Sequence, residues 1–294
     1  MHTPVLVKEV LEYLNIRPGS KIIDATISGG GHTLAILERF KDVKILGIEW
    51  DPELLKQFKL KVKSEKFKDR LILVNDSYVN LKNIVEEHRF EPDGILFDLG
   101  LSSWHYEESG RGFSFKRNEI LDMRFNPESQ PESSADIVNK YSENELRELI
   151  SSLGEEQFAG NIAKNIVRTR REKPIVMTEE LVNVISRSVP EWYKHRKIHF
   201  ATKTFQALRI AVNDELGNVR TGIMVAIDVL KPGGRLVVIS FQGLEDKIVK
   251  EIFKEKAKEG IIKFVVKGTI RPSWEEQKSN PRSRSAKMKI VEKV

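Results

Sequence analysis

The alternation of short apolar segments with helical patterns over the first hundred residues is the feature that most constrains the fold. Four segments rich in β-branched residues have the length of strands, and helical patterns separate them. Strands that alternate with helices form βαβ units, whose parallel sheets are covered by helices on both faces. The predicted strands lie at residues 21–28, 44–50, 71–75 and 93–99, and the predicted helices lie at 32–40, from 52 onwards and at 78–90. The pattern predicts an α/β fold with a Rossmann-like sheet.

The alternation stops after residue 102. Up to about residue 213 the sequence has helical patterns and polar turns without a good strand pattern, and strands then return. The predicted helices cover 143–152, 157–171, 178–188 and 199–213; a turn and strand at 230–241, a helix at 246–258 and strands at 263–270 and 287–294 follow. We therefore predict a sheet domain formed by residues 1–103 and 214–294, interrupted by a mostly helical domain at 104–213.

Composition narrows the class of protein. The chain has 294 residues, 40% of them hydrophobic, and can bury a core, but no apolar run approaches the roughly 18 residues of a membrane helix. It has no cysteine, which excludes disulfides, cysteine nucleophiles and thiolate metal sites. No metal-ligand cluster is visible in the sequence. We expect a soluble, cytoplasmic protein without a metal site, and the sequence leaves open whether it forms a homodimer.

The net charge of +6 is concentrated in two stretches. Residues 161–210 contain 11 basic and 4 acidic groups, which is a net charge of +7. Residues 261–294 contain 9 basic and 3 acidic groups, a net charge of +6, whereas residues 1–160 have a net charge of −7. Such asymmetry indicates a polyanionic partner, although a basic stretch can also be an ordinary solvated surface.

A glycine-rich turn follows the first predicted strand and opens the first helix, in the segment DATISGGGH that ends at His32. Glycines let the backbone pass close to a ligand, and a helix N-terminus favours anionic groups. Glu49 ends the second strand 20 residues after Gly29, where a carboxylate can accept two hydrogen bonds from ribose hydroxyls. The turn lacks the G-x-G-x-x-G pattern of dinucleotide sites. The turn and the carboxylate together predict a nucleoside-type cofactor.

Two further strand ends carry polar residues. Asp98 ends the fourth strand, and ligands of open parallel sheets bind beyond the carboxyl ends of the strands. Asp98 is therefore expected to point into the ligand crevice, the alternative being a cap on the following turn. Asp76 and Tyr78 follow the third strand, where an adenine ring is usually sandwiched. The sequence LKPGG before the strand at 230–241 resembles the turn that S-adenosylmethionine-dependent methyltransferases use ahead of their fifth strand.

Longer motifs narrow the resemblance. Together with DATISGGGHT, six segments in register closely resemble the MraW-type bacterial methyltransferases: DLGLSS at 98–103, RGFSF at 111–115, LDMR at 121–124, HFATKTFQALRI at 199–210, ISFQGLEDKIVK at 239–250 and NPRSRSA at 280–286. The resemblance runs from about His2 to the C-terminus. It implies a class I methyltransferase sheet with an inserted helical domain. It also implies S-adenosylmethionine-dependent methylation of N4 of a cytidine in the decoding centre of 16S ribosomal RNA.

By that resemblance, cofactor contacts fall on residues of both domains, namely Gly30, Gly31, His32, Glu49, Tyr78, Asp98 and His105. The sequence departs from the family pattern at several places. Ser28 stands where a glycine is usual, so it must have a negative φ or be strained. Glu49 replaces an Asp, and His105 replaces a Gln. Gln242-Gly243 replaces a usual His-Ser, so position 242 receives no catalytic role.

Asp98 is the candidate catalytic residue. The lone pair of cytosine N4 is delocalised into the ring, and an acceptor for an N4 hydrogen would improve the nucleophile. The carboxylate of Asp98 can supply that acceptor, or it can bind the methionine ammonium of the donor. A common aminomethyltransferase motif has an aromatic residue after the acidic position, and Leu99-Gly100-Leu101 has none. Four aromatic residues nearby can replace it or belong to the core: Trp104, Tyr106, Phe113 and Phe115.

The partner is expected to be 16S ribosomal RNA or the small ribosomal subunit, docked on the inserted domain. Along residues 199–213 an apolar stripe faces one way, and Lys203, Gln206, Arg209 and Asn213 face the other. Lys203 and Arg209 are the RNA contacts predicted there, and Arg282 and Arg284 form a second basic patch. Basic groups bind phosphates, while specificity requires base contacts.

Several other functions remain alternatives. A methyltransferase acting on a small molecule would not need a large basic insert. A methyltransferase acting on another RNA shares every feature above. A nucleotide-dependent oxidoreductase is disfavoured by the missing G-x-G-x-x-G pattern. A non-catalytic RNA-binding module is disfavoured by the intact spacing of the predicted cofactor residues.

Overall fold

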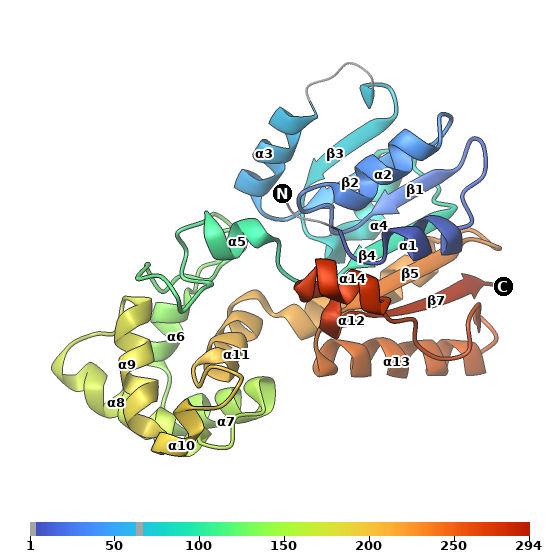
Figure 1. Ribbon diagram of the computed structural model, residues 1–294. Coiled ribbons are helices and arrows are strands. Elements are labelled where there is room, and N and C mark those ends of the chain that lie inside the picture. The colour runs from blue at the N-terminus through green and yellow to red at the C-terminus, as the bar shows by residue number, and fades with distance from the viewer. Residues whose placement is uncertain (1–3, 63–66) are drawn as a thin grey trace. The chain divides into compact units, whose positions relative to one another are not determined.

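The computed structural model describes residues 4–62 and 67–294. The chain forms two compact units, whose elements Figure 1 labels. Unit 1 comprises Met1–Ser102 and Leu216–Val294, and unit 2 comprises Ser103–Glu215. The predicted insert, 104–213, starts one residue after unit 2 starts and stops two residues before it ends. In the described ranges no helix has the length and apolar character needed to cross a membrane.

Unit 1 contains a seven-stranded sheet with the order β3-β2-β1-β4-β5-β7-β6. Strands β1 to β5 pair in parallel, and β7 is antiparallel to both of its neighbours. The strands are β1 (Lys21–Asp24), β2 (Lys44–Glu49), β3 (Leu71–Asn75), β4 (Gly94–Asp98), β5 (Arg235–Ser240), β6 (Ile262–Phe264) and β7 (Lys287–Lys293). The predicted α/β fold class is confirmed, and so is the closing pair of strands. The predicted strand at 263–270 is too long, because only an isolated bridge from Ile270 to Met288 follows β6.

The strand order places a switch point between β1 and β4. From β1 the chain proceeds outward through β2 to β3, and it then returns to the other side of β1 to form β4 and β5. Ligands of such sheets bind beyond the carboxyl ends of the strands at this point. Asp24, Glu49 and Asp98 are the last residues of β1, β2 and β4, so three carboxylates lie at this edge.

Helices cover both faces of the sheet. Buried residues of α4 (Leu81–Glu87), α12 (Glu215–Val229) and α13 (Gly243–Lys258) form one core with the strands, and α1 (Val7–Tyr13) and α2 (Gly31–Arg39) contribute to the other. The helix α3 (Pro52–Lys61) begins after Asp51, whose side chain caps it. The sequence patterns did not predict α1, α12 or α14 (Trp274–Ser279). A continuous apolar run and two glycines obscure the helical period of α12, although only one side of the helix is buried.

Unit 2 is helical and is described throughout. Its helices are α5 (Ser103–Glu107), α6 (Ser134–Lys140), α7 (Glu143–Gly154), α8 (Ala159–Glu172), α9 (Thr178–Ser188), α10 (Glu191–Lys194) and α11 (Thr202–Asn213). Capping boxes at Ser133 and Ser142 fix the starts of α6 and α7. The helix α7 packs against α8 and α11, and α8 packs against α9. The predicted helix at 199–213 begins later, at Thr202, and the ring of His199 stacks on Phe115 ahead of α11.

Candidate cofactor site

The carboxyl edge of the parallel strands in unit 1 holds a cluster of buried polar groups. Asp24 at the end of β1 is buried and accepts a hydrogen bond of 2.7 Å from Oγ1 of Thr33. The backbone N–H of Asp98 donates to Oγ1 of Thr26 over 2.7 Å, which ties the end of β4 to the turn after β1. Burial raises the pKa of Asp24, the largest of several effects on it. The carboxyl group of Asp24 at this edge is therefore shielded from water, and its ionised form is disfavoured.

The three consecutive glycines of the turn differ in what surrounds them. Gly30 has a φ of +73° and caps α2, and a Cβ there would lie 1.7 Å from the ring of Phe58. A Cβ at Gly31 would lie 2.8 Å from Pro4. A Cβ at Gly29 would meet no described atom within 4 Å. Packing thus explains glycine at positions 30 and 31, whereas position 29 borders open space. The predicted cofactor contacts of Gly30 and Gly31 stay predictions.

Ser28 adopts the strained alternative of the two that the sequence allowed, because its φ is +48°. In this conformation its backbone N–H donates to Oε2 of Glu49 over 2.9 Å. The N–H of Asp51 donates to Oε1 of Glu49, also over 2.9 Å. The turn after β1 and the start of α3 therefore fix the carboxylate of Glu49 from two sides.

The environment of Glu49 opposes its ionisation. Burial raises the pKa of Glu49 to about 7, and the nearby carboxylates of Asp51 and Asp24 add to the rise, while the two backbone N–H groups lower it. Each carboxylate oxygen accepts one backbone hydrogen bond and has a second lone pair left. Hydroxyl donors at this position would favour the ionised form. The predicted contact with ribose is thus chemically suited to the site and stays a prediction.

His32 and Asp98 form a close polar pair at the carboxyl edge of the sheet. Nε2 of His32 lies 2.8 Å from the carbonyl oxygen of Val5, which can only accept, so Nε2 carries a hydrogen. Nδ1 lies 3.4 Å from Oδ2 of Asp98, and the side chains are 5% and 15% exposed. At this separation the imidazole lies beside the carboxyl group, and only Oδ2 of Asp98 faces it.

The second oxygen of Asp98 stands out among the buried polar atoms. Oδ1 is buried and has no hydrogen-bond partner within residues 4–62 and 67–294. Burial raises the pKa of Asp98 to about 6, His32 opposes the rise, and the charge of Asp24 adds to it. A buried acceptor without a donor is costly, and such groups concentrate at functional sites. The strand-end argument from sequence thus leads to a side chain with the properties of a functional acceptor.

Tyr78 follows β3 and begins the short 3₁₀ helix η2 (Tyr78–Asn80). Its ring lies edge-on to Phe97 with the centroids 5.3 Å apart. A Cβ at Gly222 of α12 would lie 2.5 Å from the Tyr78 ring, so this glycine makes room for it. Tyr78 is partly buried against the core of unit 1, and its contact with a cofactor stays a prediction.

His105 belongs to unit 2, where it is buried within an aromatic cluster. Its ring centroid lies 5.3 Å from those of Trp104 and Phe125 and 5.1 Å from that of Phe113. Trp104 and Phe113 are themselves buried, so these two of the four aromatic candidates are core residues. The geometry of unit 1 does not test the predicted cofactor contact of His105.

The predicted RNA-binding residues of α11 are engaged within unit 2. Arg209, 14% exposed, forms a two-pronged ion pair with Glu215 at 2.6 and 2.9 Å. Nζ of Lys203 donates to the carbonyl of Glu155 over 2.6 Å. The prediction that Asn213 shares their solvent face is wrong, because Asn213 is 1% exposed. RNA contacts by Lys203 and Arg209 stay predictions.

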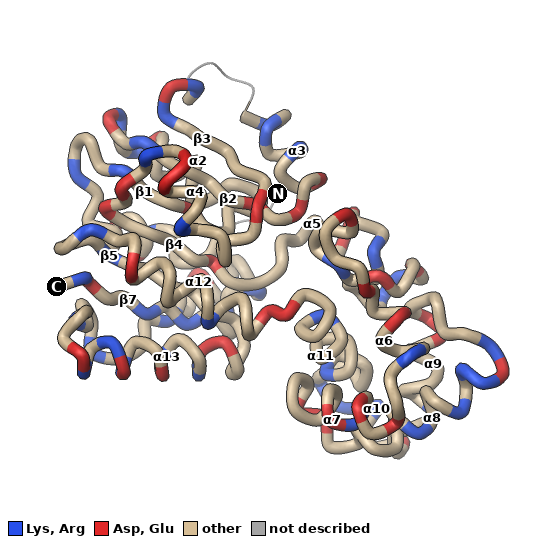
Figure 2. The backbone as a smooth tube through the Cα atoms, turned by 180° about the vertical axis from the view of Figure 1, so that it is seen from behind, with Lys and Arg blue, Asp and Glu red and all other residues tan. Residues whose placement is uncertain are grey.

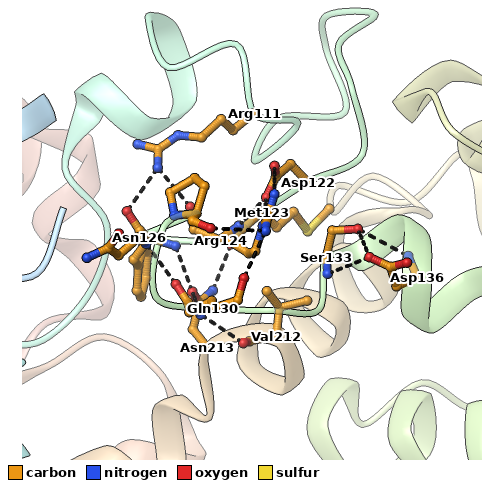
Figure 3. A network of polar contacts seen from close by, with 12 residues as sticks. Arg111, Asp122, Met123, Arg124, Asn126, Gln130, Ser133, Asp136, Val212 and Asn213 are labelled. Atoms are coloured by element: carbon orange, nitrogen blue, oxygen red, sulfur yellow. Dashed lines mark hydrogen bonds and ion pairs between the residues drawn. The ribbon is translucent and has the colours of Figure 1, made fainter. Parts of the chain in front are cut away.

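Asn213 is the centre of the polar network in Figure 3. Its Oδ1 accepts from the N–H of Phe125 and from Nε2 of Gln130, and its Nδ2 donates to the carbonyls of Met123 and Arg209. Arg124 binds both oxygens of Asp122 at 2.7 and 2.8 Å, and Arg111 donates to the carbonyls of Arg124 and Phe125. The motifs at 111–115 and 121–124 thus hold together the irregular segment before α6.

The second predicted basic patch lies in the 3₁₀ helix η3 (Pro281–Ser285) of unit 1, where Arg282 and Arg284 are exposed. Lys287 and Lys289 of β7 both pair with Asp246 of α13. Lys and Arg also gather at the end of α8 in unit 2, and Figure 2 colours these residues blue. Phosphate binding by Arg282 and Arg284 stays a prediction.

The sequence patterns missed three groups that shape the site in unit 1. Asp24 was missed because the predicted strand at 21–28 ran four residues past it, whereas the observed β1 ends at Asp24. Thr26 acts through its hydroxyl on a strand 72 residues away, and Val5 acts through its backbone carbonyl. Neither contact has a local sequence signal. Gln242, which received no catalytic role, uses its backbone and side chain to bind Glu245 at the start of α13.

Similar proteins were found over the whole chain. The MraW methylase family matches residues 1–294. A ribosomal RNA small subunit methyltransferase H from Heliobacterium mobile is 41% identical over 311 residues, with 100% of this chain and 99% of the relative covered. A protein of the same name from Elusimicrobium minutum is 44% identical over 296 residues, covering 100% and 98%. A putative methyltransferase from Streptococcus mutans, solved in complex with SAH, is 12% identical, covers 100% of each chain and has a TM-score of 0.47.

Proposed function

Because the chain belongs to the MraW methylase family, we propose that it transfers a methyl group from S-adenosylmethionine to N4 of a cytidine in the decoding centre of 16S ribosomal RNA. The relatives from Heliobacterium mobile and Elusimicrobium minutum carry the name ribosomal RNA small subunit methyltransferase H, which supports small-subunit ribosomal RNA as the substrate. The single observation that carries the chemistry is the buried Oδ1 of Asp98 at the switch point of the sheet, an oxygen that has no hydrogen-bond partner among the described residues.

The residues of this edge fit a cationic nucleoside cofactor. S-adenosylmethionine supplies an electrophilic methyl group on a positively charged sulfur. Asp24, Glu49 and Asp98 surround the switch point with carboxylates whose pKa values burial raises. A cation brought to this edge would favour their ionised forms and relieve part of the cost of burying them. The open space at Gly29 lets a ligand approach the backbone of the turn.

Glu49 is the proposed ribose-binding residue. Its two oxygens are held by the N–H groups of Ser28 and Asp51, so the side chain has one orientation before a ligand arrives. A pre-oriented acceptor binds a diol without the cost of ordering a flexible side chain. The strained φ of Ser28 is part of this arrangement, since its N–H is one of the two donors.

Asp98 is the proposed acceptor for a hydrogen of the cytosine amine. Oδ2 faces His32, which leaves Oδ1 as the oxygen available to an incoming N–H donor. The ionised carboxylate of Asp98 is a stronger acceptor than the neutral acid. A hydrogen bond from N4 would then draw electron density toward the attacking nitrogen. The alternative is that Oδ1 binds the ammonium group of the methyl donor.

Ribosomal RNA is proposed to contact both units. In unit 2 the basic residues of α8 and α11, with Lys203 and Arg209 among them, would bind phosphates, and in unit 1 Arg282 and Arg284 would do so. The target cytosine would have to leave its stack to reach a carboxylate at the sheet edge. Phosphate contacts of this kind predict an affinity that falls steeply with salt concentration.

The experiment that tests the function is methylation of small ribosomal subunits that lack their native methyl groups. The protein is incubated with these subunits and S-adenosylmethionine, and the nucleosides are then mapped by mass spectrometry. We expect one methyl group on N4 of a cytidine in the decoding centre. Methylation of another position would contradict the proposed substrate. If calorimetry shows binding of S-adenosylmethionine but no ribosomal RNA is methylated, the protein is a methyltransferase that acts on a different acceptor.

A further inference from the structure

The segment before β7 emerges at the edge of the sheet that holds the carboxylates. Lys287, the first residue of β7, pairs with Ser240 at the end of β5. Ile239, the residue before Ser240 in β5, pairs with Asp98 at the end of β4. β7 runs antiparallel to β5. The chain that leads into β7 therefore lies at the edge of the sheet where the parallel strands β1 to β5 end. That preceding chain contains α14 and η3, which pack against each other.

α14, red in Figure 1, is tied to the chain that holds His32. Oε1 of Glu276 in this helix accepts the backbone N–H of Leu6 over 2.8 Å. The neighbouring residue Val5 gives its carbonyl to His32, and Pro4 packs against Gly31 of the turn. The hydrogen bond from Leu6 thus ties α14 to a segment whose next two residues, Val5 and Pro4, contact the candidate site of the same unit.

Trp274, the first residue of α14, is 70% exposed, more than any other large hydrophobic side chain in the described ranges. Nζ of Lys278 lies 5.2 Å from the centre of its ring, and within those ranges no second aromatic ring contacts it. An indole left in water contributes little to the stability of the fold. It does provide a rigid flat surface on which a base can stack.

The charges around Trp274 are mostly positive. Residues 267–284 contain five basic and two acidic side chains. Lys267, Arg271 and Arg284 are exposed and have no ion-pair partner in residues 4–62 and 67–294. One of the two acids, Glu276, is occupied by the N–H of Leu6. An exposed aromatic ring with exposed cations before and after it in the sequence matches the combination of stacking surface and positive charge by which proteins hold single-stranded nucleic acid.

We propose that a single-stranded segment of the substrate RNA crosses unit 1 here, with one base stacked on Trp274 and its phosphates beside Arg271 and Arg284. This proposal rests on the proposed function and names the surface that would hold the RNA next to the target nucleotide. A protein partner fits the surface less well, because a single indole surrounded by cations is not the contiguous apolar patch that protein interfaces need.

The test separates stacking from phosphate contacts. The affinity of a short fluorescein-labelled single-stranded RNA is measured by fluorescence anisotropy over a range of salt concentrations. Trp274→Ala should weaken binding about 5- to 100-fold, the range for the loss of one stacked base, without changing the slope of log Kd against log salt. Trp274→Phe should retain most of the affinity. Arg284→Glu should weaken binding and also make the slope shallower by about one or two units.

Trp192 provides a matched control. It is 60% exposed in unit 2, but its ring contacts Phe158 and Tyr193, and the nearby Arg196 lies over the Tyr193 ring. Trp192→Ala should leave the affinity for the oligonucleotide within about twofold of the wild type. An equal loss in both tryptophan variants would mean that indole exposure, and not this surface, governs binding, and it would overturn the proposal.

Two further results would separate failure of this surface from failure of the proposed function. Normal RNA affinity of Trp274→Ala, together with methylation of small subunits by the wild type, would reject the stacking surface alone. A wild type that binds S-adenosylmethionine but methylates no ribosomal RNA would reject the proposed function. The wild type could methylate subunits and yet not bind the short RNA. In that case the methylation rates of the wild type and Trp274→Ala are compared at limiting subunit concentration, and equal rates would reject the stacking surface.

Discussion

The sheet edge of unit 1 and the polar network of unit 2 are both built from buried polar residues, yet they treat those residues in opposite ways. In unit 2 all four hydrogen-bonding positions of the Asn213 amide are used, and Arg124 binds both oxygens of Asp122. In unit 1 a buried oxygen of Asp98 has no partner within the described ranges. Complete networks fix one structure, and incomplete ones keep a group available.

The charges of the two regions differ in the same way. Hydrogen bonds from Lys140 and Ser133 hold the pKa of Asp136 in unit 2 below its usual value. Burial raises the pKa of Glu49 to about 7 and that of Asp98 to about 6 in unit 1. The fold thus stabilises the ionised form of a structural carboxylate in unit 2. In unit 1 it disfavours the ionised form of carboxylates to which a ligand could supply hydrogen bonds or positive charge. Changes in the two regions should consequently affect different measurements.

The largest effect is expected for Asp98→Asn, which keeps the size and removes the charge. If Oδ1 accepts the N4 hydrogen during transfer, single-turnover methylation of small subunits should slow by about 100-fold or more with little change in cofactor affinity. If Oδ1 binds the donor's ammonium group, cofactor affinity measured by calorimetry should fall first. A variant that is normal in both assays would reduce Asp98 to a cap of the turn after β4.

The same variant tests the proton linkage. The folded-state pKa of Asp98, about 6, is above the value of 3.8 for an ordinary Asp, so its ionisation between these pH values destabilises the folded protein. Asp98→Asn should therefore be more stable than the wild type at about pH 8, with the difference vanishing near pH 4. Thermal unfolding of both proteins over this range measures it. Equal pH profiles would mean that the carboxylate is solvated or permanently paired with protonated His32.

Asn213→Ala should break the other region. The change removes all four hydrogen bonds of the amide, while Gln130 keeps its bond to the carbonyl of Val212, and it should lower the free energy of unfolding by about 3 kcal/mol. Hydrogen exchange followed by mass spectrometry should show faster exchange in residues 111–136 and unchanged exchange in the strands of unit 1. Asn183→Ala, on the exposed face of α9, is the control and should change little. Unchanged protection in Asn213→Ala would show that the network is dispensable.

Glu49→Ala should weaken binding of S-adenosylmethionine by about 1.5–3 kcal/mol, the range for a charged hydrogen-bonding group. Hydroxyl donors favour the ionised carboxylate, whose pKa in the free protein is about 7, so wild-type affinity should rise with pH up to about 7 and then level off. Glu49→Gln should lose this part of the pH dependence, and Asp98 would contribute a smaller change near pH 6. Calorimetry across pH measures both effects, and a folded Glu49→Ala variant with unchanged affinity would refute the assignment.

The sequence patterns predicted the strands of unit 1 well, because buried parallel strands leave continuous apolar runs that any reader can find. The predicted strand at 71–75 and the predicted helix at 178–188 have the bounds observed for β3 and α9. The helix α12 buries one side, and it escaped prediction because Met224 on its exposed side and glycine at position 222 on its buried side blur the amphipathic period of the sequence. Strand ends were informative for the site as well, since each carboxylate at the edge follows an apolar run.

Contacts between distant segments could not be predicted in this way. The orientation of His32 depends on the carbonyl of Val5, and a backbone group has no sequence identity. The exposure of Asn213 was misread because its amide is buried by partners from residues 123–130, which an isolated helical pattern does not include. A sequence pattern cannot tell an exposed polar residue of a helix from a polar residue that is buried and fully hydrogen-bonded. Only the positions of its hydrogen-bond partners distinguish the two.

The smallest effect is expected at Ser28, one of the strained backbone positions of unit 1, where a glycine would remove the strain and keep the backbone N–H. Its φ of +48° costs a serine roughly 1–3 kcal/mol, and a glycine there avoids this cost but loses more entropy on folding, about 0.5–1 kcal/mol. Ser28→Gly should therefore raise the free energy of unfolding by about 1 kcal/mol in urea titration, while its N–H still donates to Glu49. Ser28→Ala, which keeps the strained backbone, should show no gain. A Ser28→Gly protein that is less stable, or that binds S-adenosylmethionine much more weakly, would mean that the hydroxyl itself belongs to the site. The departure from glycine at this position would then be part of the function and not a tolerated strain.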